Sequence, residues 1–443
     1  MRTNFHIKTG LVLAGCILLA PWSAFLQPPY RAKLDSLFDK IDQHKMGMGS
    51  MVISKNGHLL YQRSVGHCIF SGLKKQAAGS DTKYRIGSIS KIFTAVLIFQ
   101  LIEEGRLELS TKLDAFFPSL PNASNVNIEQ LLRHKSGFTN ITEVPHKQKP
   151  RSPAQMLTII SRNKTLGPGT KTEYSNANYL ILGYIIENIY NQPYADVLQQ
   201  RLVKKIGLKD TYFGDKVEPA KGECYSYKPR SRWRRQTPID LSIVGGSGGI
   251  VSTPADLARF IESLFSHHLI STESLSQMIT ITEEQGMGLR RYSFYGKDVY
   301  GHPGGIDAFE SVVAYFPGDS VAIAYCSNGQ VYPVENIALG ALCIFFNKAY
   351  SIPSFKKSHL SKKLLDKYCG EYLAGQPNFK IQITRFRHDL FANIDGFPSY
   401  PLMPGGKHRF VFEPAAISLE FQPRNRTLKL VFNNNGMDLV RSK

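Results

Sequence analysis

The spacing of hydrophobic residues predicts a chain that mixes buried helices with short strands. Residues 89–102 and 179–190 are apolar almost all round, which is typical of helices buried on every side. Two strand-like stretches within residues 50–61 flank Asn56-Gly57, a dipeptide that suits the tight turn of a β-hairpin. The first part of the chain is therefore expected to contain both helices and antiparallel strands.

Two further features favour an α+β fold. Residues 311–316 and 321–325 have the composition of strands and are joined by Pro-Gly-Asp. A helix is predicted to begin at Thr253, where a hydroxyl cap is followed by proline and an acidic residue in the first turn. Because the strands come in hairpins and do not alternate strictly with helices, we expect an antiparallel sheet covered by helices.

The C-terminal part of the chain has a different pattern. Residues 351–363 are polar and basic and include Pro353, so we interpret them as a linker. Beyond them, short alternating segments recur about every 10 residues, which predicts a small all-β domain, barrel or sandwich, over residues 364–443. The predicted organisation is a targeting segment at 1–26, a main domain at 30–350, the linker and the β-domain.

The N-terminal segment predicts export. Arg2 and Lys8 precede an apolar run over residues 11–20, which is too short to span a bilayer comfortably. The tetrapeptide Leu-Ala-Gly-Cys ending at Cys16 looks like a bacterial lipoprotein box. We expect a periplasmic or cell-envelope protein that is released, lipid-anchored through Cys16, or held by an uncleaved anchor. Membrane contact is expected only through this segment.

Composition and charge exclude several classes of protein. With 42% hydrophobic and 20% charged residues, the chain is not disordered, fibrous or a polytopic membrane protein. The 54 Lys and Arg residues outnumber 35 Asp and Glu residues, giving a net charge of +19 that suits anionic partners. A basic cluster surrounds Trp233 and consists of Lys228, Arg230, Arg232, Arg234 and Arg235. No nucleic-acid motif accompanies it, so we expect solvent or an anionic cell-wall polymer beside the active-site cleft, and no nucleic acid.

The cysteines give no sign of a metal site. The chain has no Cys-x-x-Cys pair and no His-Glu-x-x-His sequence, so neither a metal nor another cofactor is predicted. The five cysteines beyond the targeting segment are widely spaced, and we expect buried free thiols with room for one disulfide. They are Cys68, Cys224, Cys326, Cys343 and Cys369.

The strongest candidate for catalysis is the pair Ser88 and Lys91. Ser-x-x-Lys occurs five times, but only this copy opens a long buried helix. Backbone N–H groups and the helix dipole stabilise negative charge that develops on a serine there. Lys91 lies one turn later, where burial lowers the pKa of its amine until it can take the proton of Ser88.

Two more motifs carry suitable chemistry. Tyr174 and Asn176 form the only Tyr-x-Asn sequence, and a phenol near a lysine can be partly ionised and shuttle protons. His302 and Gly304 belong to the only His-x-Gly sequence, which leads into a strand at 309–316. An edge strand that begins with glycines lets a substrate backbone lie close. Each motif taken alone is equally an ordinary turn.

The order of the three motifs resembles the serine penicillin-recognising hydrolases, in the branch of class C β-lactamases, DD-peptidases and esterases. The resemblance covers about residues 34–347 and includes supporting segments at 131–137, 168–174 and 248–258. It implies a β-lactamase/transpeptidase-like domain. The tail from Tyr368 is similar to a small β-domain that many such hydrolases append.

The resemblance also implies roles for individual residues. Ser88 attacks a carbonyl carbon to form an acyl-enzyme, while Lys91 and Tyr174 handle the protons. Asn176 anchors the Lys91 amine and the substrate amide. The backbone N–H groups of Ser88 and Gly305 form the oxyanion hole.

The chain departs from dedicated β-lactamases at His302, which stands where they usually carry lysine. A neutral or partly charged histidine weakens carboxylate binding, so efficient β-lactamase activity is not expected. His302, Gly304 and Gly305 are expected to bind the substrate. We expect a DD-carboxypeptidase, D-aminopeptidase or esterase acting on a D-alanyl peptide or a small ester, with weak β-lactam turnover.

Two alternatives stay open at this point. Residues 245–249 match the Gly-x-Ser-x-Gly nucleophile elbow, which would make Ser247 the nucleophile. An elbow needs a strand before it and a helix that opens at the serine, so a flexible rim of the Ser88 cleft fits this segment better. The second alternative is a non-catalytic ligand sensor or scaffold with the same fold.

Overall fold

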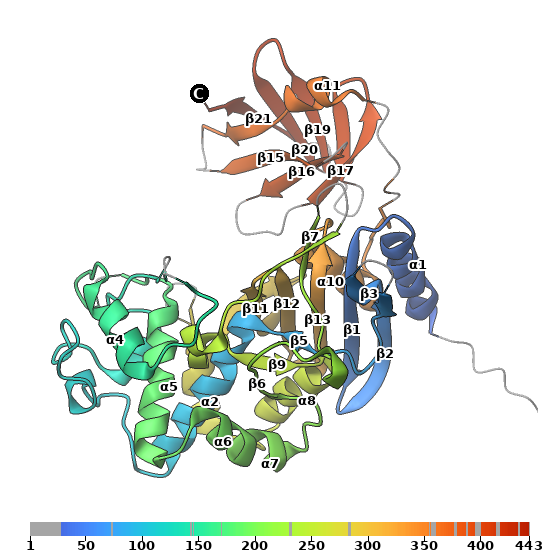
Figure 1. The fold of residues 1–443 in the computed structure, drawn as a ribbon. Coiled ribbons are helices and arrows are strands. Elements are labelled where there is room, and N and C mark those ends of the chain that lie inside the picture. The colour runs from blue at the N-terminus through green and yellow to red at the C-terminus, as the bar shows by residue number, and fades with distance from the viewer. Residues whose placement is uncertain are drawn as a thin grey trace, which may run out of the picture.

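The fold is a helix-covered antiparallel sheet followed by a β-barrel, as seen in a computed structural model (Figure 1). The structure describes residues 28–71, 74–141, 144, 146–169, 171–229, 233–281, 285–353, 355, 360–375, 379–386, 389–394, 400–412, 417–432 and 435–442. The predicted targeting segment with Cys16, and the basic residues Arg230 and Arg232, lie outside these described residues. In the described part of the chain, no helix is both long and apolar enough to cross a membrane.

Six strands form the central sheet, in the order β10-β11-β12-β13-β1-β2, and all neighbours are antiparallel. The predicted hairpin at residues 50–61 is the β1–β2 pair, with Asn56 at φ 50° and Gly57 at φ 78°. Two successive positive φ values match the right-handed twist of the flanking strands. The strands are β1 Gly47–Lys55, β2 His58–Val65, β10 Arg290–Phe294, β11 Lys297–Ile306, β12 Phe309–Phe316 and β13 Val321–Gln330.

The central strands are buried on both faces of the sheet. Along β13, Ala322, Ala324 and Cys326 belong to the larger core, which lies on one face of the sheet. The intervening Ile323 and Tyr325 belong to a second core under the other helical layer. Because side chains alternate between faces, this arrangement explains why the strand is apolar at nearly every position.

Helices cover the two faces of the sheet. The helices α1 Pro29–Gln43 and α10 Val334–Phe345 contact each other and enclose the second core. On the other face lies α8 Pro254–Phe265, whose predicted cap is present because Thr253 accepts a hydrogen bond from the N–H of Asp256. Beyond it, α2 Ser90–Glu103 and α5 Asn176–Tyr190 are buried on nearly every side, as their composition predicts. This places the N-terminus of α2 beside the sheet.

The remaining elements of the main domain are short. The helical ones are η1 Gly87–Ile89, η2 Leu113–Ala115, α3 Ile128–Leu132, α4 Pro153–Arg162, α6 Tyr194–Leu198, η3 Gln199–Val203, α7 Lys204–Ile206, η4 Pro219–Lys221, η5 Leu241–Ile243, η6 Gly245–Ser247 and α9 Thr272–Ile279. The strands are β3 His67–Ser71, β4 Lys74–Ala77, β5 Tyr84–Arg85, β6 Tyr212–Phe213, β7 Tyr227–Pro229, β8 Trp233–Arg235 and β9 Ile250–Ser252.

The C-terminal β-strands close into a barrel, drawn in orange to red in Figure 1. It has its own core, which includes Leu365 from the preceding helix α11 Lys362–Asp366, so that helix begins inside the predicted linker. Closure pairs β14 with β21 and leaves no open edge. The all-β prediction is confirmed, as a barrel. Its strands are β14 Gly370–Leu373, β15 Lys380–Phe386, β16 Asp389–Ile394, β17 Tyr400–Gly406, β18 Arg409–Phe412, β19 Ile417–Gln422, β20 Thr427–Phe432 and β21 Asn435–Arg441.

Candidate active site

Ser88 lies where β5 turns into the helix α2. It sits in the 3₁₀ turn Gly87–Ile89, which runs directly into α2, and it is only partly buried. Gly87 has φ 53°, and a Cβ atom there would lie 2.7 Å from the backbone nitrogen of Gly305. A side chain at Gly87 would therefore push β11 away from Ser88. The turn presents the Ser88 hydroxyl to the glycine-containing half of β11.

The Lys91 amine is held by three groups. Its Nζ lies 2.7 Å from Asn176 Oδ1, 2.9 Å from the Ser247 carbonyl oxygen and 3.0 Å from Ser88 Oγ. Burial, and then the nearby charge of Arg290, hold the pKa of Lys91 well below its ordinary value. A neutral amine has two hydrogens and one lone pair. Because the amide and carbonyl oxygens only accept, they take the hydrogens and leave the lone pair for the Ser88 hydroxyl.

Tyr174 is the second side chain that contacts the Ser88 hydroxyl. Its hydroxyl donates a hydrogen bond of 2.9 Å to Ser88 Oγ, and Lys91 Nζ lies 4.9 Å from the centre of its ring. Burial raises the pKa of Tyr174, and the hydrogen bond to Ser88 offsets this only in part. The resting group is thus the protonated phenol, and the partial ionisation expected from the sequence does not fit this environment.

Asn176 is the first residue of α5. The N-cap of that helix is Ser175, whose Oγ accepts from the N–H of Ala177, and the Asn176 N–H donates to Asn140 Oδ1 at 3.1 Å. These contacts fix the side chain that receives the Lys91 hydrogen bond. The remaining Asn176 Nδ2 is a donor suited to a substrate carbonyl.

The His-x-Gly segment does not precede an edge strand, as the sequence suggested. It forms the second half of β11, and the strand at 309–316 lies inside the sheet between β11 and β13. β10 pairs with β11 only as far as Gly301, so residues 302–306 extend beyond it. The prediction was wrong because residues 302–306 themselves belong to a strand, β11, which pairs with residues 309–315 and places them inside the sheet.

His302 is a neutral residue in this site. It is buried, its Nδ1 contacts the Pro303 carbonyl oxygen at 2.5 Å, and its ring centre lies 6.1 Å from that of Tyr174. Burial is the main cause that lowers the pKa of His302 to about 3, and the charge of Lys91 adds to it when that amine is protonated. The histidine therefore supplies no positive charge to a substrate at neutral pH.

Arg290 is a candidate site residue that the sequence interpretation missed. It begins β10, and its guanidinium lies 5.3 Å from the centre of the Tyr174 ring. Its Nε is buried and has no hydrogen-bond partner among the described residues. Its charge lowers the pKa of both Lys91 and His302. No motif marks this arginine, and only the pairing of β10 with β11 brings it to the site.

His134 supports the Tyr174 loop from behind. Its buried Nδ1 accepts from the N–H of Ser175 at 3.1 Å, and its backbone carbonyl accepts from the N–H of Glu173 at 2.8 Å. Its ring centre lies 4.5 Å from that of Tyr174. The two peptide contacts hold the backbone on both sides of the tyrosine, which gives a structural purpose to the segment at 131–137.

Ser247 does not form a nucleophile elbow. The element before it is a 3₁₀ turn at Leu241–Ile243, and no strand leads into it. Its side chain is 1% exposed and donates a 2.6 Å hydrogen bond to the Val244 carbonyl. The expectation of a flexible rim is also wrong, because this segment packs against α2 and α5 and bonds Lys91 through a carbonyl. Only the folded chain reveals these contacts.

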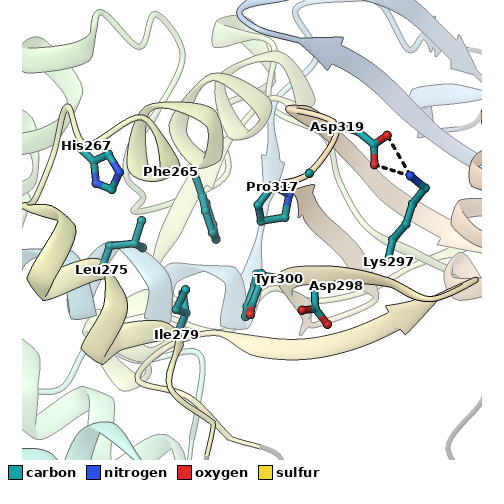
Figure 2. A pocket seen from close by; sticks show the side chains of 10 residues that line it. Phe265, His267, Leu275, Ile279, Lys297, Asp298, Tyr300, Pro317 and Asp319 are labelled. Carbon is teal, nitrogen blue, oxygen red and sulfur yellow. Dashed lines mark hydrogen bonds and ion pairs between the residues drawn. The ribbon is translucent and has the colours of Figure 1, made fainter.

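A groove of about 530 Å³ lies away from this centre (Figure 2). It is formed by the end of α8, by α9, by the first half of β11 and by the β12–β13 turn. Lys297 and Asp319 form an ion pair of 2.9 Å at its border. Its lining includes none of the residues that surround Ser88.

Comparison with known proteins identifies the family. A sequence model of the β-lactamase family, described as "Beta-lactamase", matches residues 34–342, so the chain belongs to this family. It is 24% identical to "Penicillin-binding protein 4*" of Bacillus subtilis over 428 residues, covering 88% of this chain and 93% of that protein. It is 26% identical to "Teichoic acid D-alanine hydrolase" of Staphylococcus aureus over 281 residues, covering 61% and 68%.

Solved structures share the fold. The D-amino acid amidase of Ochrobactrum anthropi is 22% identical with a TM-score of 0.64, over 71% of this chain and 99% of that one. The octameric penicillin-binding protein homologue of Pyrococcus abyssi is 22% identical with a TM-score of 0.65, over 92% and 99%. The expected β-lactamase-like fold is thereby confirmed. The family and its named relatives indicate a serine hydrolase that acts on an amide or ester.

Proposed function

We propose that this member of the β-lactamase family is a DD-carboxypeptidase-type serine hydrolase, which cleaves a D-alanyl peptide through an acyl-enzyme on Ser88. The observation that carries the proposal is the position of Ser88 Oγ, 3.0 Å from Lys91 Nζ and 2.9 Å from the Tyr174 hydroxyl. One neighbour offers a lone pair and the other a proton. This is what activation of a hydroxyl nucleophile requires.

Acylation begins with transfer of the Ser88 proton to the neutral Lys91 amine. As Ser88 Oγ bonds to the carbonyl carbon, the carbonyl π electrons move to its oxygen. The N–H groups of Ser88 and Gly305 are the proposed donors to that oxyanion, and the close approach of Gly87 to Gly305 supports their convergence. No cofactor is needed for this step.

Collapse of the tetrahedral intermediate breaks the bond to the leaving group. The protonated Tyr174 supplies a proton to the departing nitrogen or oxygen, and the proton held on Lys91 replaces it. In deacylation, water adds to the ester carbonyl and the same groups act in reverse, which regenerates Ser88. Because burial raises the pKa of Tyr174, its phenol is protonated before the reaction and has a proton to give to the leaving group.

The charge around Ser88 favours a substrate with a carboxylate. Arg290 is the cation that influences Lys91, Tyr174 and His302, whereas no described carboxylate influences any of these three groups. A free C-terminal carboxylate next to the scissile bond would be attracted, and an N-terminal ammonium repelled. This favours a carboxypeptidase over a D-aminopeptidase. Two relatives, a teichoic acid D-alanine hydrolase and a D-amino acid amidase, act on D-amino acid groups by name, which supports a D-alanyl acyl group.

The test compares three substrates. The protein should hydrolyse an acylated D-alanyl-D-alanine peptide faster than the same peptide with an amidated C-terminus, and faster than D-alanine p-nitroanilide. A penicillin should label Ser88 and be released slowly. Equal or greater activity on the anilide would refute the carboxypeptidase proposal, and absence of all turnover would leave a ligand sensor as the better description.

An anionic cell-wall polymer is the proposed partner of the β7–β8 hairpin. Lys228 and Arg234 are directly opposed on its two strands and exposed, and no described residue forms an ion pair with either. Like charges facing each other destabilise a hairpin unless an anion lies between them. Ser226 at the base of the hairpin bonds Ala308, which follows Gly305 closely. A partner of this kind would place the protein in the cell envelope, which is the location that we propose.

The polymer proposal has its own test. Binding of the protein to a polyphosphate column should fall with added salt and should weaken in a Lys228→Gln/Arg234→Gln double variant. A matched double variant at Arg424 and Arg426 of the barrel provides the control. Equal retention of both double variants would count against the hairpin.

A further inference from the structure

Three cysteines from distant parts of the sequence lie in one buried region. Cys68 lies on β3, Cys224 precedes β7, and Cys326 lies on β13; each is at most 1% exposed. Both thiols are free in the structure, and each is close enough to the other to shift its pKa. The Cys68 thiol also donates to the carbonyl oxygen of Gly222, two residues before Cys224, at 4.0 Å. The backbones are adjacent as well, because the N–H of Tyr225 donates to the Cys68 carbonyl at 3.3 Å. The contacts of Cys68 with Gly222 and Tyr225 therefore place it beside Cys224.

We propose that Cys68 and Cys224 form a disulfide when the chain folds in an oxidising compartment. The oxidant is the disulfide of a thiol–disulfide exchange partner, such as glutathione disulfide. Both S–H bonds are lost and one S–S bond forms, while the partner disulfide takes up two electrons and two protons and leaves as two thiols. The proposal concerns a covalent modification and is independent of the substrate.

The environment gives the two thiols different roles. The neighbouring Cys224 thiol lowers the pKa of Cys68, whereas burial raises the pKa of Cys224 well above its ordinary value. Cys68 is thus the better thiolate for attack on the exchange partner, and Cys224 then displaces that partner from the mixed disulfide. Because both thiols are at most 1% exposed in the folded chain, the exchange requires a partly opened state in which these two segments are already side by side.

The other described cysteines are less suited to this bond. Cys326 lies on an inner strand between Ser50 and Ser311, and burial alone raises its pKa. Cys343 belongs to the core on the opposite face of the sheet. Cys369 belongs to the barrel region. Among the described cysteines, Cys68 and Cys224 are the pair whose segments are joined by backbone hydrogen bonds.

The disulfide would also restrain the strand β5, which leads to Ser88. The N–H of Cys224 donates to the Lys83 carbonyl at 3.0 Å, and β5 runs from Tyr84 towards Ser88. Asn328 Nδ2 already joins the two sides, donating to the carbonyls of His67 and Tyr225 at 3.0 and 2.9 Å. The disulfide would therefore reinforce an existing contact between β3 and the residues before β7.

Peptide mapping of the full chain tests the proposal directly. The protein is refolded with a mixture of reduced and oxidised glutathione, then denatured in excess iodoacetamide without reductant and digested. We expect one linked peptide pair containing Cys68 and Cys224, with Cys326, Cys343 and Cys369 alkylated. Alkylation of both Cys68 and Cys224, or a linked pair that contains Cys326, would overturn it.

Thermal unfolding with and without reductant gives a second measurement. Reductant should lower the Tm of the oxidised wild type by roughly 5–10 °C and leave a Cys68→Ala/Cys224→Ala double variant unchanged. The control is Cys343→Ala, another buried thiol, which should keep the response of the wild type. An equal response to reductant in the double variant would contradict the proposal. If that variant does not fold, peptide mapping of the wild type is the deciding test.

Discussion

Ser88 and Ser247 both lie next to Lys91, yet their chemistry differs. Ser88 approaches Lys91 through its hydroxyl, which is partly exposed and also receives the Tyr174 hydrogen bond. Ser247 contacts Lys91 through its backbone carbonyl, while its buried hydroxyl donates a hydrogen bond to the Val244 carbonyl. The comparison teaches that a serine becomes a nucleophile through the bonds its hydroxyl makes, and a Gly-x-Ser-x-Gly sequence does not ensure them.

Replacing Ser88 should have the largest effect. Ser88→Ala removes the hydroxyl that contacts both Lys91 and Tyr174, so kcat/KM for a D-alanyl peptide should fall by about 10³-fold or more. Steady-state hydrolysis, together with mass spectrometry for the acyl-enzyme, measures the loss. An acyl-enzyme in this variant would show that another residue is the nucleophile.

Replacing Lys91 should reduce kcat almost as strongly. Lys91→Met keeps a long buried side chain but removes the proton acceptor, and we expect a loss of about 10²–10⁴-fold. In the wild type the amine must be neutral, so kcat/KM should fall as pH drops through the lowered pKa of Lys91. A wild-type profile with an acid limb near the ordinary lysine pKa would argue against the neutral amine.

Tyr174→Phe tests the proton donor with little change in packing. The leaving group loses its acid and Ser88 loses one hydrogen bond, so kcat should fall by about 10²-fold. An activated ester with a good leaving group needs less protonation and should lose less activity than an amide. A uniform loss on both substrates would assign Tyr174 to positioning alone.

Arg290→Gln should act on substrate binding and on the pH profile. We expect KM for the peptide with a free carboxylate to rise by about 10-fold, with little change for its amidated form. Loss of the positive charge also raises the pKa of Lys91, so the acid limb of kcat/KM should move to higher pH. Equal effects on both peptides would contradict a carboxylate contact.

Ser247→Ala should have the smallest effect. The carbonyl that binds Lys91 belongs to the backbone and stays in place, so kcat/KM should remain within about 2-fold of the wild type. A loss comparable to that of Ser88→Ala would restore the elbow interpretation. Circular dichroism of both variants controls for unfolding.

Much of the local structure could be predicted from residue patterns. The hairpin at Asn56-Gly57, the buried helices α2 and α5 and the cap at Thr253 all depend on neighbours within a few positions. The position of His302 was predicted less well. The sequence interpretation placed His302 before a strand, whereas His302 lies within β11, which pairs with β12 along residues 300–306.

By itself, the sequence determined the element types, the α+β class and the three motifs, because hydrophobic periodicity, turn chemistry and residue order are local properties. Only the tertiary structure decided which serine faces Lys91, that Arg290 joins the site, and that Cys68 meets Cys224. Those outcomes depend on contacts between residues far apart in the chain. Burial at these contacts then sets the pKa values of Lys91, Tyr174 and His302.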